Sequence, residues 1–177
     1  AHLVRGQLPC VFAEADGVLR AALRAHAPEV VVLVGQADGR AALSVERVAI
    51  NVDDARIPDN AGAQPIDEPI APRGPVAYWS TLPIKATVAA LRQSGLPAEV
   101  SQTAGTFLCN HVFYTLMRSL ARRPGVRGGF IHVPLLPEQR PGAPSLDLAS
   151  QARGLEVVIA TALARRKDLE LAGGAIC

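Results

Sequence analysis

Segments with strand-like and helix-like patterns alternate along the chain. The run EVVVLVG (29–35) holds five β-branched or leucine residues closed by glycine, which is typical of a parallel strand covered on both faces. Further strands are predicted over 45–51, over 98–101 and within GGFIHVPLLP (128–137), and a weaker one over 3–8. The strand within 128–137 is expected to be central because it is uniformly apolar.

Helical spacing of apolar residues predicts four helices. The first covers 12–25, and the second begins at Pro83 and ends before Gly95. The third occupies the later part of AGTFLCNHVFYTLMRSL (104–120), and Ser145 can cap a long fourth helix. Helices that alternate with strands imply βαβ crossovers, and hence a mostly parallel sheet covered on both faces.

A stretch rich in Pro, Asp, Asn and Gly, residues 53–75, interrupts this alternation. A loop of this length inside a compact domain is usually functional. In open α/β sheets, ligands bind beyond the carboxyl ends of the strands. We therefore expect one site where four segments meet: after Gln36, after Asn51, over 103–109 and at the end of GGFIHVP.

Composition and charge indicate which kinds of protein and partner fit this chain. The chain has 177 residues, a net charge of +2 and only seven aromatic residues, with no basic-aromatic interleaving. These features predict one globular domain over 1–177 and argue against a nucleic-acid partner. No apolar run reaches the length of a membrane span, and no leader pattern is found, so we expect a cytoplasmic protein without a membrane partner.

The three cysteines are Cys10, Cys109 and Cys177. Their odd number and wide spacing fit neither a disulfide framework nor a paired-ligand metal site. Cys10 is expected to be structural and Cys177 an exposed end. Cys109 lies where a turn becomes a helix, and the bare N–H groups of a helix start favour a thiolate. Cys109 is therefore a candidate nucleophile, and the alternative is a buried, inert thiol.

A nucleophilic thiol needs a base, and His132 lies at the ligand-binding end of a predicted strand. The alternative is a core histidine bonded to a carbonyl. His111 is a poor partner for Cys109, because residues two apart on a helix point to nearly opposite faces.

A catalytic imidazole is usually oriented by a third group. Glu46, in LSVERVAIN, is a charged residue in an otherwise apolar strand and is one candidate. An ordinary strand-end carboxylate is the alternative. Asp53 and Asp54 compete for the orienting role, although they suit the shaping of the long loop better.

Several blocks of this sequence resemble the pyrrolidone carboxyl peptidases, also called pyroglutamyl peptidases of type I. The blocks are VGQADGR (34–40), ERVAINVDDARIPDN (46–60), YWSTLPIK (78–85), SQTAGTFLCNHVFY (101–114) and GFIHVPLLPEQ (129–139). They follow the order and spacing of the family. The resemblance implies a three-layer αβα sandwich around a mostly parallel, mixed sheet.

The resemblance also implies a cysteine exopeptidase that removes an N-terminal pyroglutamyl residue from peptides through a thioester, with no metal or organic cofactor. By resemblance Cys109 is the nucleophile, His132 the base and Glu46 the group that orients the imidazole. Substrate-binding positions are also implied: Gln36 would contact the lactam, Ile57 and Phe107 would form apolar walls, and Arg56 would help to stabilise the oxyanion.

The resemblance further implies a homotetramer. Family members begin with a strand, a loop rich in glycine and phenylalanine, and a helix, and we expect the domain over 1–177 to lack these. Two alternatives are weighed against the peptidase. A glutamine-hydrolysing amidase would place its thiol on a Gly-x-Cys-x-Gly elbow, whereas Leu108 and Asn110 flank Cys109. An inactive relative or a small-metabolite-binding domain would use Cys109 only for packing.

Overall fold

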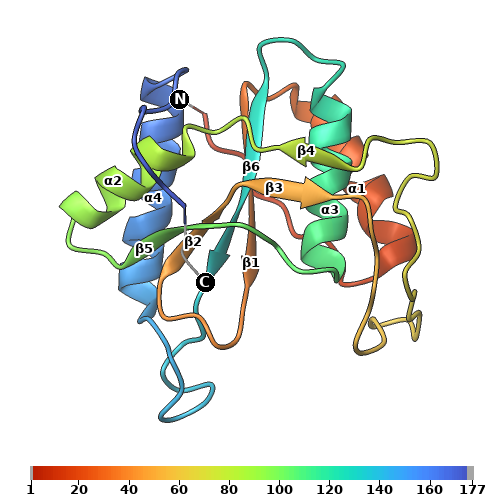
Figure 1. The fold of residues 1–177 in the computed structure, drawn as a ribbon, viewed down its shortest axis with the longest axis horizontal. Coiled ribbons are helices and arrows are strands. Elements are labelled where there is room, and N and C mark those ends of the chain that lie inside the picture. The colour runs from red at the N-terminus through yellow and green to blue at the C-terminus, as the bar shows by residue number, and fades with distance from the viewer. Residues whose placement is uncertain (1, 175–177) are drawn as a thin grey trace.

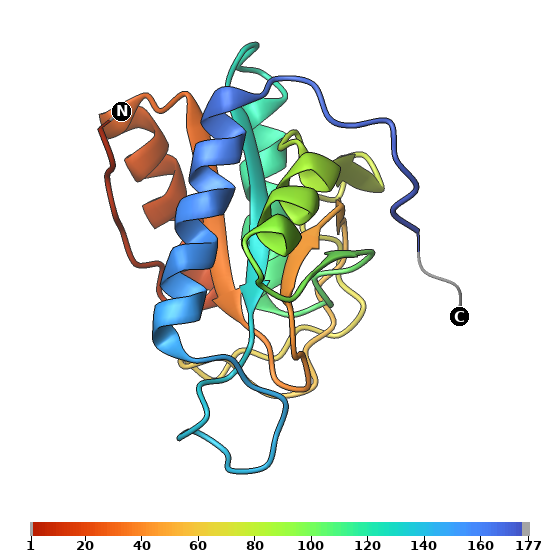
Figure 2. The ribbon, with the colours of Figure 1, turned by 90° about the vertical axis from the view of Figure 1, so that its left-hand side faces the viewer.

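A four-stranded mixed sheet lies between two layers of helices in the computed structural model, which describes residues 2–174 (Figure 1) (Figure 2). The helices are α1 (Phe12–His26), α2 (Ile84–Gln93), α3 (Leu108–Leu120) and α4 (Leu148–Ala164). The strands are β1 (Val30–Gln36), β2 (Leu43–Glu46), β3 (Val48–Ile50), β4 (Ala77–Trp79), β5 (Ala98–Ser101) and β6 (Arg127–Val133). The predicted three-layer α/β architecture is confirmed.

The sheet has the strand order β1-β6-β2-β5. The pairs β1·β6 and β2·β5 are parallel, and β2·β6 is antiparallel. The strands β2 and β5 therefore run opposite to β1 and β6. This topology corrects the expectation that four carboxyl ends meet at one edge, because β1 and β6 end on one side of the sheet and β2 and β5 end on the opposite side.

Alternation of side chains along the strands divides the core into two parts. Val31 and Leu33 of β1 and Phe130 of β6 pack with α1 and α3 in one cluster. Val30, Val32, Ile131 and Val133 pack with α2 and α4 in the other. All seven residues of β6 are buried, which confirms its predicted central place. Within residues 2–174, β1 has only one neighbouring strand, so its residues are half-buried or, at Val34 and Gln36, exposed rather than covered on both faces.

Several predicted elements differ from the structure. The predicted strand over 45–51 is split near Arg47: β2 ends at Glu46, and β3 leaves the main sheet to pair with β4, which the sequence analysis missed. Residues 3–8 form no strand. The cap of α4 is Asp147, whose side chain accepts a hydrogen bond from the Ser150 N–H at 2.9 Å, and not Ser145.

The long predicted loop is ordered by specific hydrogen bonds. The Asp59 carboxylate accepts the N–H of Phe12 at 2.8 Å, at the start of α1, where the N-cap residue Val11 supplies no side-chain acceptor. The N–H of Asn60 donates to the carbonyl of Cys10 at 3.0 Å. The loop is thus joined to α1 across more than forty residues of sequence, and it caps that helix.

No helix in the part of the chain described, residues 2–174, is long and apolar enough to cross a bilayer.

Candidate active site

Three strands present small or polar side chains to the layer that contains α3. Alternation places Gly35, Glu46 and His132 on the same face of the sheet as Leu33 and Phe130. The register then brings them together: Gly35 pairs with His132, and Ser44, two residues before Glu46, pairs with His132 from the other side. The candidate site therefore lies across the face of the sheet, next to the start of α3.

His132 and Glu46 form a buried hydrogen-bonded pair. The Nδ1 atom of His132 lies 2.7 Å from Oε1 of Glu46. Glu46 is fully buried, and His132 is 3% exposed. Because an ionised carboxylate only accepts, Nδ1 carries the proton in this pair, and Nε2 is left as a base. The structure thus places Glu46, and not Asp53, against the imidazole, since Asp53 bonds to His111.

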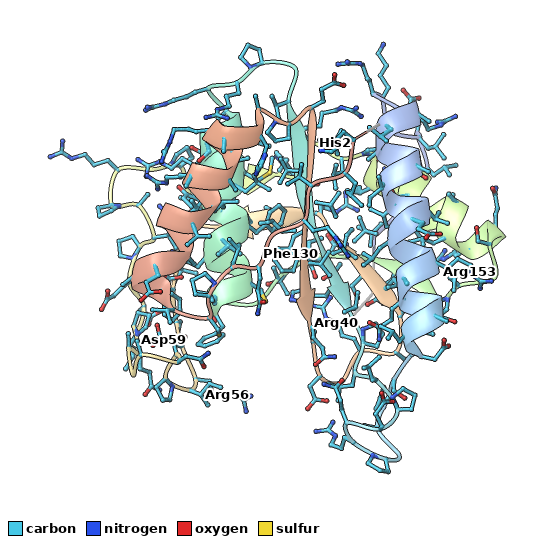
Figure 3. All side chains as sticks on the ribbon, turned by 180° about the vertical axis from the view of Figure 1, so that it is seen from behind. His2, Arg40, Arg56, Asp59, Phe130 and Arg153 are labelled. Carbon is cyan, nitrogen blue, oxygen red and sulfur yellow. The ribbon has the colours of Figure 1, made fainter. Side chains whose placement is uncertain are left out.

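The thiol of Cys109 lies over β1, which is the strand paired with the strand of His132. Cys109 is the second residue of α3. A Cβ atom added to Gly35 would come within 2.9 Å of its sulfur and within 2.8 Å of the Phe130 ring. Since Gly35 pairs with His132, the sulfur lies beside the imidazole strand. Figure 3 shows Phe130 on the side of the sheet that faces α1 and α3.

Gly35 is a functional position that the sequence analysis missed. Only a residue without a side chain leaves room for both the sulfur and the aromatic ring. The available signal was the glycine that closes EVVVLVG, which was interpreted only as the end of a strand.

Burial raises the pKa of the Cys109 thiol to about 11, with further increases from Cys10 and Glu46, while Arg40 acts in the opposite direction. The expectation that the helix start would lower this pKa is therefore wrong for this structure, because loss of hydration outweighs the helix field. A raised pKa favours the protonated thiol. A protonated thiol needs a neighbouring base to take its proton before it reacts as a nucleophile, and His132, on the strand that pairs with Gly35, is the candidate base.

The four predicted substrate-binding residues lie in three separate segments of the chain. Phe107 immediately precedes α3, and its ring packs edge-on against Phe12 at 5.4 Å. The exposed Gln36 donates from Nε2 to Oε1 of Gln139 at 2.7 Å, and Gln139 donates back at 3.0 Å. Arg56 and Ile57 are exposed on the long loop, outside the sheet and helices (Figure 3). The roles of all four remain predictions.

The expectations for the other two thiols have separate outcomes. Cys10 is exposed, which corrects the expectation of a structural residue. Cys177 lies outside the described residues. Across residues 2–174, no three His, Cys, Asp or Glu side chains are grouped as metal ligands.

Asn110 connects the thiol helix to the long loop, and the sequence analysis also missed this role. Its fully buried side chain accepts from the N–H of Ile50 at 3.0 Å and donates to the carbonyls of Ile50 and Val52 at 2.9 and 3.0 Å. The residue beside the nucleophile candidate therefore fixes the backbone where the loop begins.

His111 lies between two carboxylates, one from the long loop and one from α1. Its Nδ1 is 2.7 Å from Oδ2 of Asp53, and its Nε2 is 3.3 Å from Oδ1 of Asp16 in α1. Burial lowers the pKa of His111, but its contacts with Asp16 and Asp53 and their charges outweigh this effect and raise the pKa to about 9. His111 thus joins α1, α3 and the loop, and its raised pKa favours the protonated imidazolium.

Comparisons with known sequences give consistent matches over nearly the whole chain. A family described as "Pyroglutamyl peptidase" matches residues 1–165. A pyrrolidone-carboxylate peptidase of Erwinia tasmaniensis is 59% identical over 99% of this chain and 83% of its own length. One from Escherichia fergusonii is 57% identical over 98% of this chain and 83% of its own length.

Solved structures show the same fold. The pyroglutamyl peptidase I of Bacillus amyloliquefaciens matches with a TM-score of 0.92 and 48% identity, covering 94% of this chain and 80% of that chain. The pyrrolidone carboxyl peptidase of Thermococcus litoralis matches with a TM-score of 0.90 and 36% identity, covering 93% and 81%.

Gly35→Ala should destabilise the protein, because the added methyl group would overlap the Cys109 sulfur and the Phe130 ring. We expect the free energy of unfolding, measured in denaturant, to fall by roughly 1–3 kcal/mol. Gly17→Ala is the matched control, since a Cβ there meets nothing within 4 Å and lies in a helix. Equal stabilities of the two variants would contradict the close packing at Gly35.

The His111 cluster should make stability depend on pH. The pKa of His111 is raised from 6.5 to about 9 on folding, so its stabilising contribution is complete below pH 6.5 and is lost as the pH rises through 9. We expect His111→Asn to cost roughly 2–3 kcal/mol at pH 6 and much less at pH 10, measured by denaturant unfolding. A cost that is independent of pH would exclude a charged His111.

Proposed function

The chain belongs to the pyroglutamyl peptidase family, and on that basis we propose that Cys109, His132 and Glu46 together remove an N-terminal pyroglutamyl residue from peptides. The observation that carries this proposal is the register of three strands. It sets Gly35, His132 and Glu46 side by side beneath the thiol. The family match supports this reading over a metabolite-binding domain in which Cys109 only packs.

The first step forms a tetrahedral intermediate, which becomes a thioester when the leaving amine departs. The neutral Nε2 atom of His132 takes the proton of the Cys109 thiol while the sulfur attacks the carbonyl that joins the pyroglutamyl ring to the next residue. Glu46 holds Nδ1–H and stabilises the imidazolium that forms. The carbonyl oxygen becomes an oxyanion near the first turn of α3, whose initial N–H groups have no partner within the helix.

The second half of the cycle releases both products. The imidazolium of His132 gives its proton to the leaving amine as the carbon–nitrogen bond breaks. Water then attacks the thioester with His132 again acting as base, and the sulfur leaves with a proton. The raised pKa of Cys109 suits this cycle, because the resting thiol is neutral and gains charge only when the base acts.

Recognition of the lactam is assigned to Gln36, at the end of β1. An uncharged ring needs amide partners rather than an ion pair, and Gln36 carries both a donor and an acceptor. The reciprocal bonds with Gln139 hold this amide in one orientation. Phe107 and Ile57 are proposed as apolar walls, and Arg56 as a cation that approaches the oxyanion. The homotetramer and the cytoplasmic location remain predictions.

Cys109→Ser should abolish turnover. We expect hydrolysis of a pyroglutamyl-anilide to fall by about 10³-fold or more, because a hydroxyl is a much weaker nucleophile in this setting. Cys10→Ser is the matched control, since that thiol is exposed and outside the proposed machinery. A wild-type protein no faster than Cys109→Ser would refute the proposed function.

Gln36→Leu should weaken recognition of the lactam. We expect kcat/KM for a pyroglutamyl-anilide to fall by about 10- to 100-fold, because the ring amide would lose a hydrogen-bonding partner. Gln139→Leu, which removes only the residue that orients Gln36, should have a smaller effect. If Gln139→Leu is the more damaging change, then Gln139 rather than Gln36 contacts the ring.

A further inference from the structure

Arg40 makes an ion pair with the proposed catalytic carboxylate. It lies in the segment between β1 and β2, and its Nη1 atom donates to Oε1 of Glu46 at 2.8 Å. This is the same oxygen that accepts Nδ1–H of His132 at 2.7 Å. The other oxygen of Glu46, Oε2, is buried without a hydrogen-bond partner. All contacts of the carboxylate are therefore concentrated on one oxygen, between a guanidinium and an imidazole.

A fully buried carboxylate needs a positive charge to remain ionised. A neutral imidazole supplies a donor but no charge, whereas a guanidinium is always protonated. The carboxylate closest to Arg40 in sequence, Asp38, is bound instead by Arg140 on the surface. Arg40 is thereby left to pair with Glu46.

The second nitrogen of Arg40 reaches the segment that leads to the thiol. Nη2 donates to the carbonyl of Thr103 at 3.1 Å. Thr103 lies between β5 and α3, six residues before Cys109. One planar group thus joins the carboxylate of β2 to the turn that precedes the nucleophile. The compact ammonium of a lysine lacks the fork that would reproduce both bonds.

We propose that Arg40 is a positioning residue of the proposed reaction: it holds the Glu46 carboxylate against His132 and fixes the Thr103 turn relative to that pair. The proposal rests on the proposed function for its kinetic consequences. The charge of Arg40 also favours the Cys109 thiolate, since it lowers the pKa that burial raises. Figure 3 shows Arg40 near one end of the central strands, close to the loops at that end.

The first test compares Arg40→Gln, Arg40→Lys and Arg140→Gln in the full chain. With a pyroglutamyl-anilide, we expect Arg40→Gln to lower kcat by about 10- to 100-fold with little change in KM, because the catalytic groups and not the substrate contacts are displaced. Arg140→Gln removes the ion pair with Asp38 and so loosens the segment that contains Arg40, but its kcat should stay near that of the wild type. An equal loss in Arg140→Gln would overturn the proposal, since loosening of the segment would then explain the effect.

The second readout needs no turnover. Alkylation of Cys109 by iodoacetamide is followed against pH, and the labelled peptide is quantified by mass spectrometry so that Cys10 does not contribute. We expect the alkylation profile of Arg40→Gln to move to higher pH, and that of Arg40→Lys to lie near wild type because the charge is kept. An unchanged profile in Arg40→Gln would overturn the electrostatic part of the proposal. A wild-type protein that fails to hydrolyse the anilide would refute only the proposed function.

If Arg40→Gln alone does not fold, a double variant with Glu46→Gln still tests the proposal. In a Glu46→Gln background the buried charge is gone, so adding Arg40→Gln should cost far less stability than it does in the wild type. Thermal unfolding of the four proteins in this cycle measures the difference. Additive losses would show that Arg40 and Glu46 act independently, which would overturn the proposal.

Discussion

The hydrogen bond between His132 and Glu46 is the contact on which the rest of the site depends. It crosses the one antiparallel junction of the sheet, β2·β6, and it is sealed between α3 and the strands. A buried carboxylate is costly to desolvate, so the surrounding chain must supply partners for it. His132 and Arg40 are those partners, and each comes from a different segment. The site is therefore assembled by the fold as a whole.

The thiol is brought to this pair by packing. The Phe130 ring and the Cys109 sulfur occupy the space that a side chain at Gly35 would fill, which holds α3 close to the sheet. The same closeness removes the thiol from water and raises its pKa. Tight packing and the raised pKa of the thiol are thus two results of one arrangement.

Much of this could be predicted from the sequence. The apolar runs and helical spacings identified the four helices, β1, β5 and β6, because these segments have strong local patterns. Cys109, His132 and Glu46 could be selected as candidates from their positions in these patterns and from the family resemblance, and their roles stay predictions. Strand direction could not be predicted, since it depends on pairing between distant segments, and so the expected meeting of four strand ends was wrong. Gly35 and Arg40 were missed because their roles depend on neighbours that only the fold supplies.

Three consecutive residues at the start of α3 bond or pack in three directions. Cys109 packs on the sheet, Asn110 binds the backbone of Ile50 and Val52, and His111 lies between Asp16 and Asp53. Successive helical residues diverge by about 100° around the axis, so these contacts together fix the rotational phase of the helix. If α3 could rotate about its axis, the Cys109 sulfur would change its position over the sheet. Here the angular setting of the nucleophile is determined by its two neighbours in sequence, neither of which needs to approach the substrate.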